Sequence, residues 1–156
     1  MRRADRQITD DARIDGIIRA CTCCRLGLCD EGQAYIVPLS FGFEHTDSGR
    51  FFYFHSAREG RKLDLLRRNP AVSFELDTGY QLHTAPTACG CSAGFQSVMG
   101  TGTVRFLTDG EERRHALLQL MRQLTGTDAW DFSDAALSQV CVLSLQVTSL
   151  TCKVHA

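Results

Sequence analysis

The sequence has no long apolar run and almost no net charge. Its 156 residues include 17 Lys and Arg against 18 Asp and Glu, a formal net charge of −1. This balance removes the electrostatic attraction on which non-specific nucleic-acid binding depends, so we expect no nucleic-acid partner. A membrane-spanning helix needs about 20 predominantly apolar residues in a row. No such stretch occurs, and we expect no membrane association.

Other missing signals limit the possible location, fold class and domain number of the protein. The first residues, MRRADRQITD, alternate charges and lack the apolar segment of a secretion signal, so we expect a cytoplasmic protein. No G-x-G-x-x-G follows a predicted strand, as it would in a dinucleotide-binding Rossmann unit. The length suits one domain rather than two. Residues 1–156 show no linker, repeat or low-complexity segment, and we predict a single domain.

Cysteine, by contrast, is abundant, with eight in the chain. In a reducing cytosol such residues are thiols or metal ligands before they are disulfides. Those near apolar strands, such as Cys24, behave as small hydrophobic side chains. The sequence lacks the repeated C-x-x-C spacing of a zinc ribbon, so we predict no bound metal. The alternative is a zinc or iron–sulfur site formed by Cys21, Cys24, Cys89 and Cys91.

Apolar periodicity predicts a mainly β protein with helices, of the α+β class. The expected order, α-β-β-β-α-β-β-α-β with short early hairpins, favours an antiparallel barrel decorated by helices. Residues Tyr80 to Gly94 have little pattern and are expected to be mostly loop. The expected strands are 25–29, 34–44, 50–54, 71–77, 97–107 and 140–147, and the expected helices begin after Thr9 or Asp10, cover 57–68, and run from Thr108 to Gly126.

Two of these strands contain residues that weaken regular pairing. Pro38 lacks an amide donor, so its strand is expected to lie at a sheet edge or to bulge there, which leaves backbone groups free. Gly100 and Gly102 place two bare positions on one face of another strand. We expect a second backbone or a ligand to come close at these glycines.

The stretch FYFHSAREGRK, residues 52–62, begins as an apolar strand and ends in cations. Ser56 and Glu59 have the S-x-x-E spacing of a capping box, which predicts a helix starting at Ala57. Gly60 would then lie in the first turn, where glycine is unfavourable but lets a ligand approach the backbone. A helix N-terminus offers unpaired amides and a partial positive charge. The pattern therefore predicts an anion site.

Three cations surround this predicted helix start: Arg58, Arg61 and Lys62. Projecting over one helix face they would repel one another, and an anion such as phosphate would offset that repulsion. The alternative is a solvated helix face on which Glu59 and Asp64 pair with the cations. Two or three charge-assisted hydrogen bonds contribute only ~4 to 8 kcal/mol before ordering costs. A tight ligand must also bury an apolar group, so we predict a flat ring that carries a phosphate.

Six stretches, in order along nearly the whole chain, match a known family. They are MRRADRQITD (1–10), CRLGL (24–28), VPLSFG (37–42), YFHSAREGRK (53–62), NPAVSFELD (69–77) and SVMGTGTV (97–104). On these stretches the chain resembles the flavin-binding split-barrel proteins related to pyridoxamine 5′-phosphate oxidase, and most closely their nitroimidazole resistance branch. The resemblance implies an antiparallel six-stranded split β-barrel with flanking helices. It also implies a homodimer that binds FMN where the two barrels meet.

The same resemblance implies where the cofactor lies. It places the flavin phosphate against Ser56, Arg61 and Lys62. It places the isoalloxazine ring along the strand 37–41, with His55 near the ring and a further pair of residues approaching from another strand. The implied cofactor-binding residues are Val37, Pro38, Leu39, Ser40, Phe41, His55, Ser56, Arg61, Lys62, Ser97 and Val98.

The activity that the resemblance implies is an FMN-dependent oxidoreductase. It would pass electrons from reduced flavin to a small planar acceptor such as a nitroimidazole or another nitroaromatic. His55 is the candidate catalytic residue, and its alternative role is to hydrogen-bond the turn. A pyridoxamine-phosphate-type oxidase would need a second phosphate site, and the sequence has no second Arg or Lys cluster. A flavin- or haem-binding protein without turnover, or a zinc-binding module, is the alternative of a different class.

Overall fold

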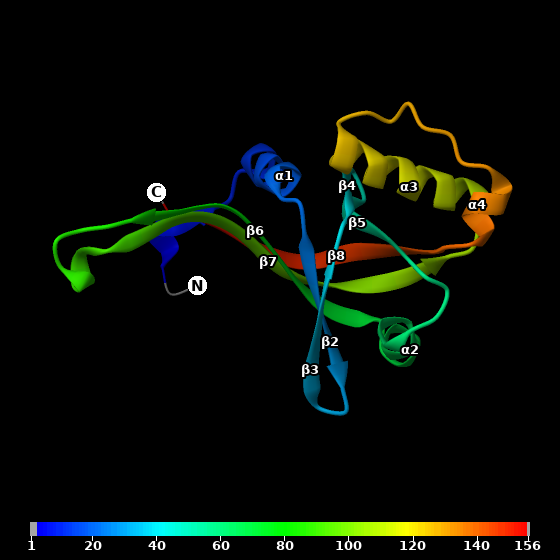
Figure 1. Ribbon diagram of the computed structural model, residues 1–156, viewed down its shortest axis with the longest axis horizontal. Coiled ribbons are helices and arrows are strands. Elements are labelled where there is room, and N and C mark those ends of the chain that lie inside the picture. The colour runs from blue at the N-terminus through cyan, green and yellow to red at the C-terminus, as the bar shows by residue number, and fades with distance from the viewer. Residues whose placement is uncertain (1–2, 156) are drawn as a thin grey trace.

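The eight strands of the computed structural model, which describes residues 3–155, form one antiparallel sheet (Figure 1). Their order is β3-β2-β6-β7-β8-β5-β4, and β1 pairs with β8. The predicted class, mainly antiparallel β with helices, is confirmed. The strands are β1 (Gln7–Ile8), β2 (Cys24–Asp30), β3 (Gln33–Leu39), β4 (Gly42–Thr46), β5 (Gly49–Ser56), β6 (Ala71–His83), β7 (Ser92–Leu107) and β8 (Cys141–His155).

Over residues 3–155 the sheet does not close, because β3 and β4 lie at its two ends. These edge strands follow each other in the chain and are joined by Ser40 and Phe41. The prediction of one strand over 34–44 is therefore wrong, whereas the predicted edge position of Pro38 is confirmed. Phe41 is fully buried and packs edge-on against Phe52, with ring centroids 5.5 Å apart. Burial of this ring brings the chain across the split. The structure has eight strands rather than the expected six, because the expected strand 34–44 is divided into β3 and β4 and because β1 was not expected.

Helices flank the split barrel (Figure 1). Asp10 caps the first helix by accepting a hydrogen bond from the Arg13 amide at 2.8 Å. The third helix begins at Gly110 rather than at Thr108, and Asp109 caps it, because its carboxylate accepts from two amides at 3.0 Å. In the part of the chain that the structure describes, none of the helices combines the length and the apolar character needed to cross a membrane. The helices are α1 (Asp11–Ala20), α2 (Arg61–Arg68), α3 (Gly110–Thr125) and α4 (Asp134–Ser138), with 3₁₀ turns at Ala4–Arg6 and Ala88–Gly90.

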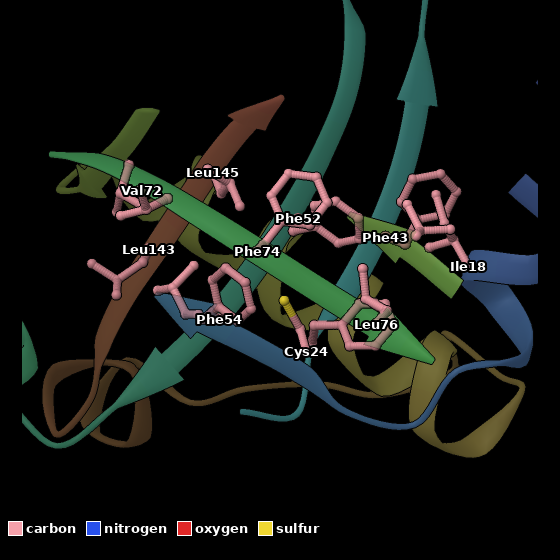
Figure 2. Close-up of a cluster of buried hydrophobic side chains, with 14 of the residues drawn as sticks. Ile18, Cys24, Phe43, Phe52, Phe54, Val72, Phe74, Leu76, Leu143 and Leu145 are labelled. Atoms are coloured by element: carbon pink, nitrogen blue, oxygen red, sulfur yellow. The ribbon is translucent and has the colours of Figure 1, made fainter. Parts of the chain in front are cut away.

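The core of the barrel is rich in aromatic rings (Figure 2). Phe52 and Phe74 come from different strands, and their ring centroids lie 5.1 Å apart. At Gly100 and Gly102 a Cβ atom would meet the carbonyl oxygens of β8 at 2.3 Å. The predicted close approach of a second backbone at these glycines is thus confirmed, and it lets β7 and β8 curve tightly around the core.

Beyond the barrel, β6 and β7 continue together as a long hairpin (Figure 1). The prediction of a loop over Tyr80 to Gly94 is wrong, because β6 extends to His83 and pairs with Ser92 at the start of β7. Gly79 adopts a φ of 66° where the register shifts between Thr78 and Gln81. Because of this shift, the alternation of apolar and polar residues is not regular along β6, although its backbone continues to pair with β7.

Candidate functional site

The cationic turn between β5 and α2 differs from the expected capping box. Ser56 ends β5, where it pairs with Cys141, and α2 begins only at Arg61. The N-cap is Gly60, with φ 136° and no side-chain hydrogen bond to the helix. The capping box and the helix start at Ala57 are therefore wrong, because pairing with β8 keeps Ser56 in the strand. Gly60 adopts a conformation that side chains disfavour, which explains a glycine here.

The N-terminus of α2 leaves backbone donors available. The amides of Leu63 and Asp64 both donate to the Gly60 carbonyl, at 2.9 and 3.2 Å. Within residues 3–155, the amides of Arg61 and Lys62 have no acceptor. Unpaired amides combined with the positive end of a helix dipole form a preorganised anion site.

Ser56 supplies a second, independent feature of this site. Its Oγ atom is buried and has no hydrogen-bond partner among the described residues. A buried hydroxyl left unpaired costs about 1 to 3 kcal/mol, so such groups are nearly always satisfied by some partner. Ser56 alternates with His55 along β5 and therefore shares the interior face with Phe54. A polar group of a ligand would satisfy this hydroxyl.

Arg61 is held by the β2–β3 hairpin. Its Nε and Nη2 atoms donate to Oδ2 of Asp30 at 3.0 and 2.7 Å, and its guanidinium lies 4.6 Å from the Tyr35 ring centroid. Arg68 donates to the other Asp30 oxygen at 3.3 Å. The hydrogen bond that Arg61 donates lowers the pKa of Asp30, so this carboxylate stays ionised. Sequence reasoning missed Asp30 and Tyr35, since it treated the hairpin only as a turn between strands.

The three predicted cations do not lie on one helix face. Arg58 precedes α2, so only Arg61 and Lys62 occupy its first turn. Asp64 pairs with Arg67 at 2.9 Å. Within residues 3–155, Lys62 forms no ion pair. The predicted grouping of three cations is thus wrong, but two of them meet at the helix start with the free amides.

The segment 37–41 forms the edge of the split next to Tyr35. Val37 and Leu39 are half-buried and pack against the core, whereas Pro38 and Ser40 are exposed. Because β3 is an edge strand, the backbone groups on its outer side face no neighbouring strand of the described chain. This edge offers both apolar contact and backbone hydrogen bonds to a flat ring.

His55 points away from this edge. It lines an apolar cavity of about 200 Å³ between β5, α3 and α4, on the opposite face of the strand from Ser56. The cavity is otherwise lined by Leu117, Leu120, Met121, Phe132, Ala136 and Val140. The structure therefore separates the side chains of His55 and Ser56, although the two residues are adjacent.

Ser97 and Val98 lie far from Arg61 on the same chain. Val98 is fully buried in the core, and Ser97 pairs with Asp77 on β6. Arg25, near the start of β2, pairs with Glu75 of β6, so Asp77 and its partner Ser97 lie beyond that end of β2. Arg61 contacts Asp30, which is at the opposite end of β2. At about 3.3 Å per residue these positions are roughly 20 Å apart along the strands. One chain does not bring both halves of the predicted site together.

The alternative metal ligands do not come together either. Cys21 is buried at the end of α1 and Cys24 at the start of β2, whereas Cys89 and Cys91 are exposed at the tip of the β6–β7 hairpin. Among residues 3–155, no group of three or more His, Cys, Asp or Glu side chains is placed to hold a metal ion. Burial raises the pKa of the Cys21 thiol to about 12 and also raises the pKa of Cys24.

These buried thiols predict a loss of stability at alkaline pH. Folded Cys21 and Cys24 stay neutral, whereas the unfolded chain releases their protons above the ordinary value of 9.0. The free energy of unfolding should fall between pH 9 and 12, by at most ~1.4 kcal/mol per pH unit for each thiol. Urea unfolding at several pH values measures this slope. Cys24→Ala should flatten it, and exposed Cys89→Ala should not. Equal slopes in the two variants would contradict the assignment.

Comparison with known proteins gives one family and one fold. Residues 10–154 match the family model described as pyridoxamine 5′-phosphate oxidase. A solved structure of a candidate 5-nitroimidazole antibiotic resistance protein from Bacteroides thetaiotaomicron is 38% identical. The match covers 95% of this chain and 86% of that chain, with a TM-score of 0.82. A search of curated proteins found no match.

Two further solved structures share the fold at lower identity. The flavocytochrome Anf3 from Azotobacter vinelandii is 19% identical with a TM-score of 0.83, over 100% of this chain and 72% of that chain. The FAD and heme binding protein from Mycobacterium smegmatis is 17% identical with a TM-score of 0.80, over 96% and 73%. These likenesses concern the fold alone, and with the open sheet they confirm the predicted split barrel.

Proposed function

The chain belongs to the pyridoxamine 5′-phosphate oxidase family, whose members bind flavins, and we propose that it is an oxidoreductase that holds FMN by its phosphate at the start of α2. The observation that supports this proposal is a buried, unpartnered Ser56 hydroxyl at the end of β5, followed along the chain by the free amides of Arg61 and Lys62 at the start of α2. A phosphoryl group satisfies both, because its oxygens accept hydrogen bonds from hydroxyl, amide and cationic donors. A mass spectrum of the small molecule released on denaturation tests the proposal: FMN supports it, and the release of only another cofactor overturns it.

The residues of this chain would bind and orient the cofactor. Arg61, Lys62 and the first amides of α2 would hold the phosphate, and the Ser56 hydroxyl would donate to it. The exposed backbone of β3 would meet the polar edge of the ring, while Val37 and Leu39 provide apolar contact. When bound, the flavin itself supplies the electron-transfer chemistry.

We propose that two copies of the chain complete the site. Ser97 lies roughly 20 Å from Arg61 along the strands, so a second copy must bring its own β7 to the flavin if both contact it. Ile36 and Met99 adjoin the two halves of the predicted site, and their side chains are 64% and 57% exposed. Apolar side chains this exposed and this close to both halves favour burial against a partner. A homodimer with the flavin at its interface explains their exposure.

We propose a small planar acceptor, such as a nitroimidazole or another nitroaromatic. The support is the 38% identity to a candidate 5-nitroimidazole antibiotic resistance protein. The eight unpaired cysteines suit a reducing compartment, and we propose a cytoplasmic location.

The role of His55 can be tested separately from flavin binding. A proton donor near the acceptor accelerates transfer by 10² to 10⁴-fold in typical enzymes. We expect His55→Gln to slow reoxidation of the reduced protein by a nitroaromatic at least tenfold, with FMN affinity within about twofold of wild type. Stopped-flow absorbance measures the first and fluorescence titration the second. Unchanged reoxidation would leave His55 only a structural role.

A further inference from the structure

We propose that Asp30 is a positioning residue that holds Arg61 ready for the cofactor phosphate and thereby favours phosphorylated flavins over unphosphorylated ones. The inference rests on the proposed function, since it concerns the same site. Asp30 ends β2, and its side chain is only 18% exposed. One of its oxygens accepts from both Nε and Nη2 of Arg61.

The guanidinium of Arg61 can bind Asp30 and a phosphate through different nitrogen atoms. An arginine side chain presents five N–H donors in a rigid plane. Asp30 uses the Nε and Nη2 edge of Arg61, at 3.0 and 2.7 Å. The Nη1 donors form no hydrogen bond within residues 3–155. A phosphate can therefore bind at the free end without displacing Asp30.

Two further contacts fix this arrangement. The Tyr35 ring lies under the guanidinium at 4.6 Å, which limits tilting of the plane. Arg68, on the same helix, donates to the second oxygen of Asp30 at 3.3 Å and so orients the carboxylate. The Arg61 hydrogen bond also lowers the pKa of Asp30, so the carboxylate is ionised at neutral pH. Asp30 thus belongs to a cluster with Arg61, Arg68 and Tyr35 rather than to an isolated surface ion pair.

The cluster connects the two ends of the proposed cofactor site. Asp30 and Tyr35 belong to the β2–β3 hairpin, whereas Arg61 and Arg68 belong to α2. Tyr35 precedes the segment 37–41, along which the flavin ring is proposed to lie. The ion pair therefore fixes the phosphate-binding side chain relative to the ring-binding strand. Without it, the long Arg61 side chain must be ordered when the phosphate binds, and that ordering reduces affinity.

The experiment compares FMN with riboflavin, which has the same ring but no phosphate. Fluorescence titration in about 0.5 M salt screens the charge of Asp30 and isolates its positioning role. We expect Asp30→Ala to weaken FMN binding about fivefold, equivalent to ~1 kcal/mol. Riboflavin affinity should change less than about twofold, since the ring-binding strand is untouched. Asp64→Ala is the matched control, because Asp64 pairs with Arg67 in the same helix, and it should leave both affinities unchanged.

Each result decides the proposal. Tighter FMN binding by Asp30→Ala would show that Asp30 competes with phosphate, and equal weakening of both flavins would show a structural role. Either outcome, or no change at all, overturns the inference.

A second variant covers the case in which the alanine variant fails to fold. Asp30→Asn, which keeps the shape of the side chain but only one acceptor oxygen, must still lower the ratio of FMN affinity to riboflavin affinity. Wild-type protein that does not prefer FMN over riboflavin would overturn the proposed phosphate site as well. A wild-type preference that survives in both Asp30 variants would overturn only the inference.

Discussion

Replacing Arg61 and Lys62 together with alanine is expected to weaken FMN binding at least tenfold. Each charge-assisted hydrogen bond to a phosphate contributes about 1.5 to 3 kcal/mol, and solvent reduces this value at an exposed helix end. Two such losses still exceed the ~1.4 kcal/mol that corresponds to a tenfold change. The free amides of α2 remain in the variant, so binding should be weakened rather than abolished. Fluorescence titration with FMN measures the effect.

The matched control removes two other exposed cations. Arg67→Ala with Arg105→Ala changes the net charge equally but leaves the start of α2 intact, because these residues pair with Asp64 and Glu112. FMN affinity in this control should stay within about twofold of wild type. Equal weakening in both double variants would mean that overall charge, and not the α2 site, attracts the flavin.

Replacing Ile36 with glutamate is expected to give a monomer that binds FMN more than tenfold more weakly. Ile36 is 64% exposed on the edge strand β3, so the single chain should fold normally. In the proposed dimer the same side chain becomes buried, and a buried charge without a partner costs several kcal/mol. Loss of the partner also removes its share of the flavin site. Analytical ultracentrifugation gives the mass, and fluorescence titration gives the affinity.

Leu124 provides the control for this variant. It is an apolar side chain, 48% exposed on α3, away from both halves of the proposed site. Leu124→Glu adds the same charge, and both the dimer and FMN binding should persist. A wild-type protein that is already a monomer at micromolar concentration would contradict the proposed interface.

The sequence predicted the elements better than their ends. The helix expected after Asp10 and the strand expected over 71–77 were predicted from local periodicity, and the structure has α1 and the first part of β6 at these places. The start of α2 was misplaced because the S-x-x-E spacing of Ser56 and Glu59 satisfies a local rule. Pairing of Ser56 with Cys141, which is distant in the sequence, overrides that rule. Long-range strand pairing is not visible in local spacing.

The candidate site was predicted in part. Arg61 and Lys62 do meet the free end of a helix, as the cationic stretch indicated. Asp30 and Tyr35 could not be predicted, because their role depends on how the β2–β3 hairpin folds back onto α2. The opposite directions of His55 and Ser56 follow from strand alternation, which becomes visible only once β5 is known to continue through Ser56.

A crystal structure of the protein grown with FMN tests the central claim most directly. The account predicts the phosphorus atom at the N-terminus of α2, with phosphate oxygens within hydrogen-bond distance of the Arg61 and Lys62 amides and of Ser56 Oγ. Density for the flavin phosphate at any other place, with the start of α2 facing only solvent, would contradict it.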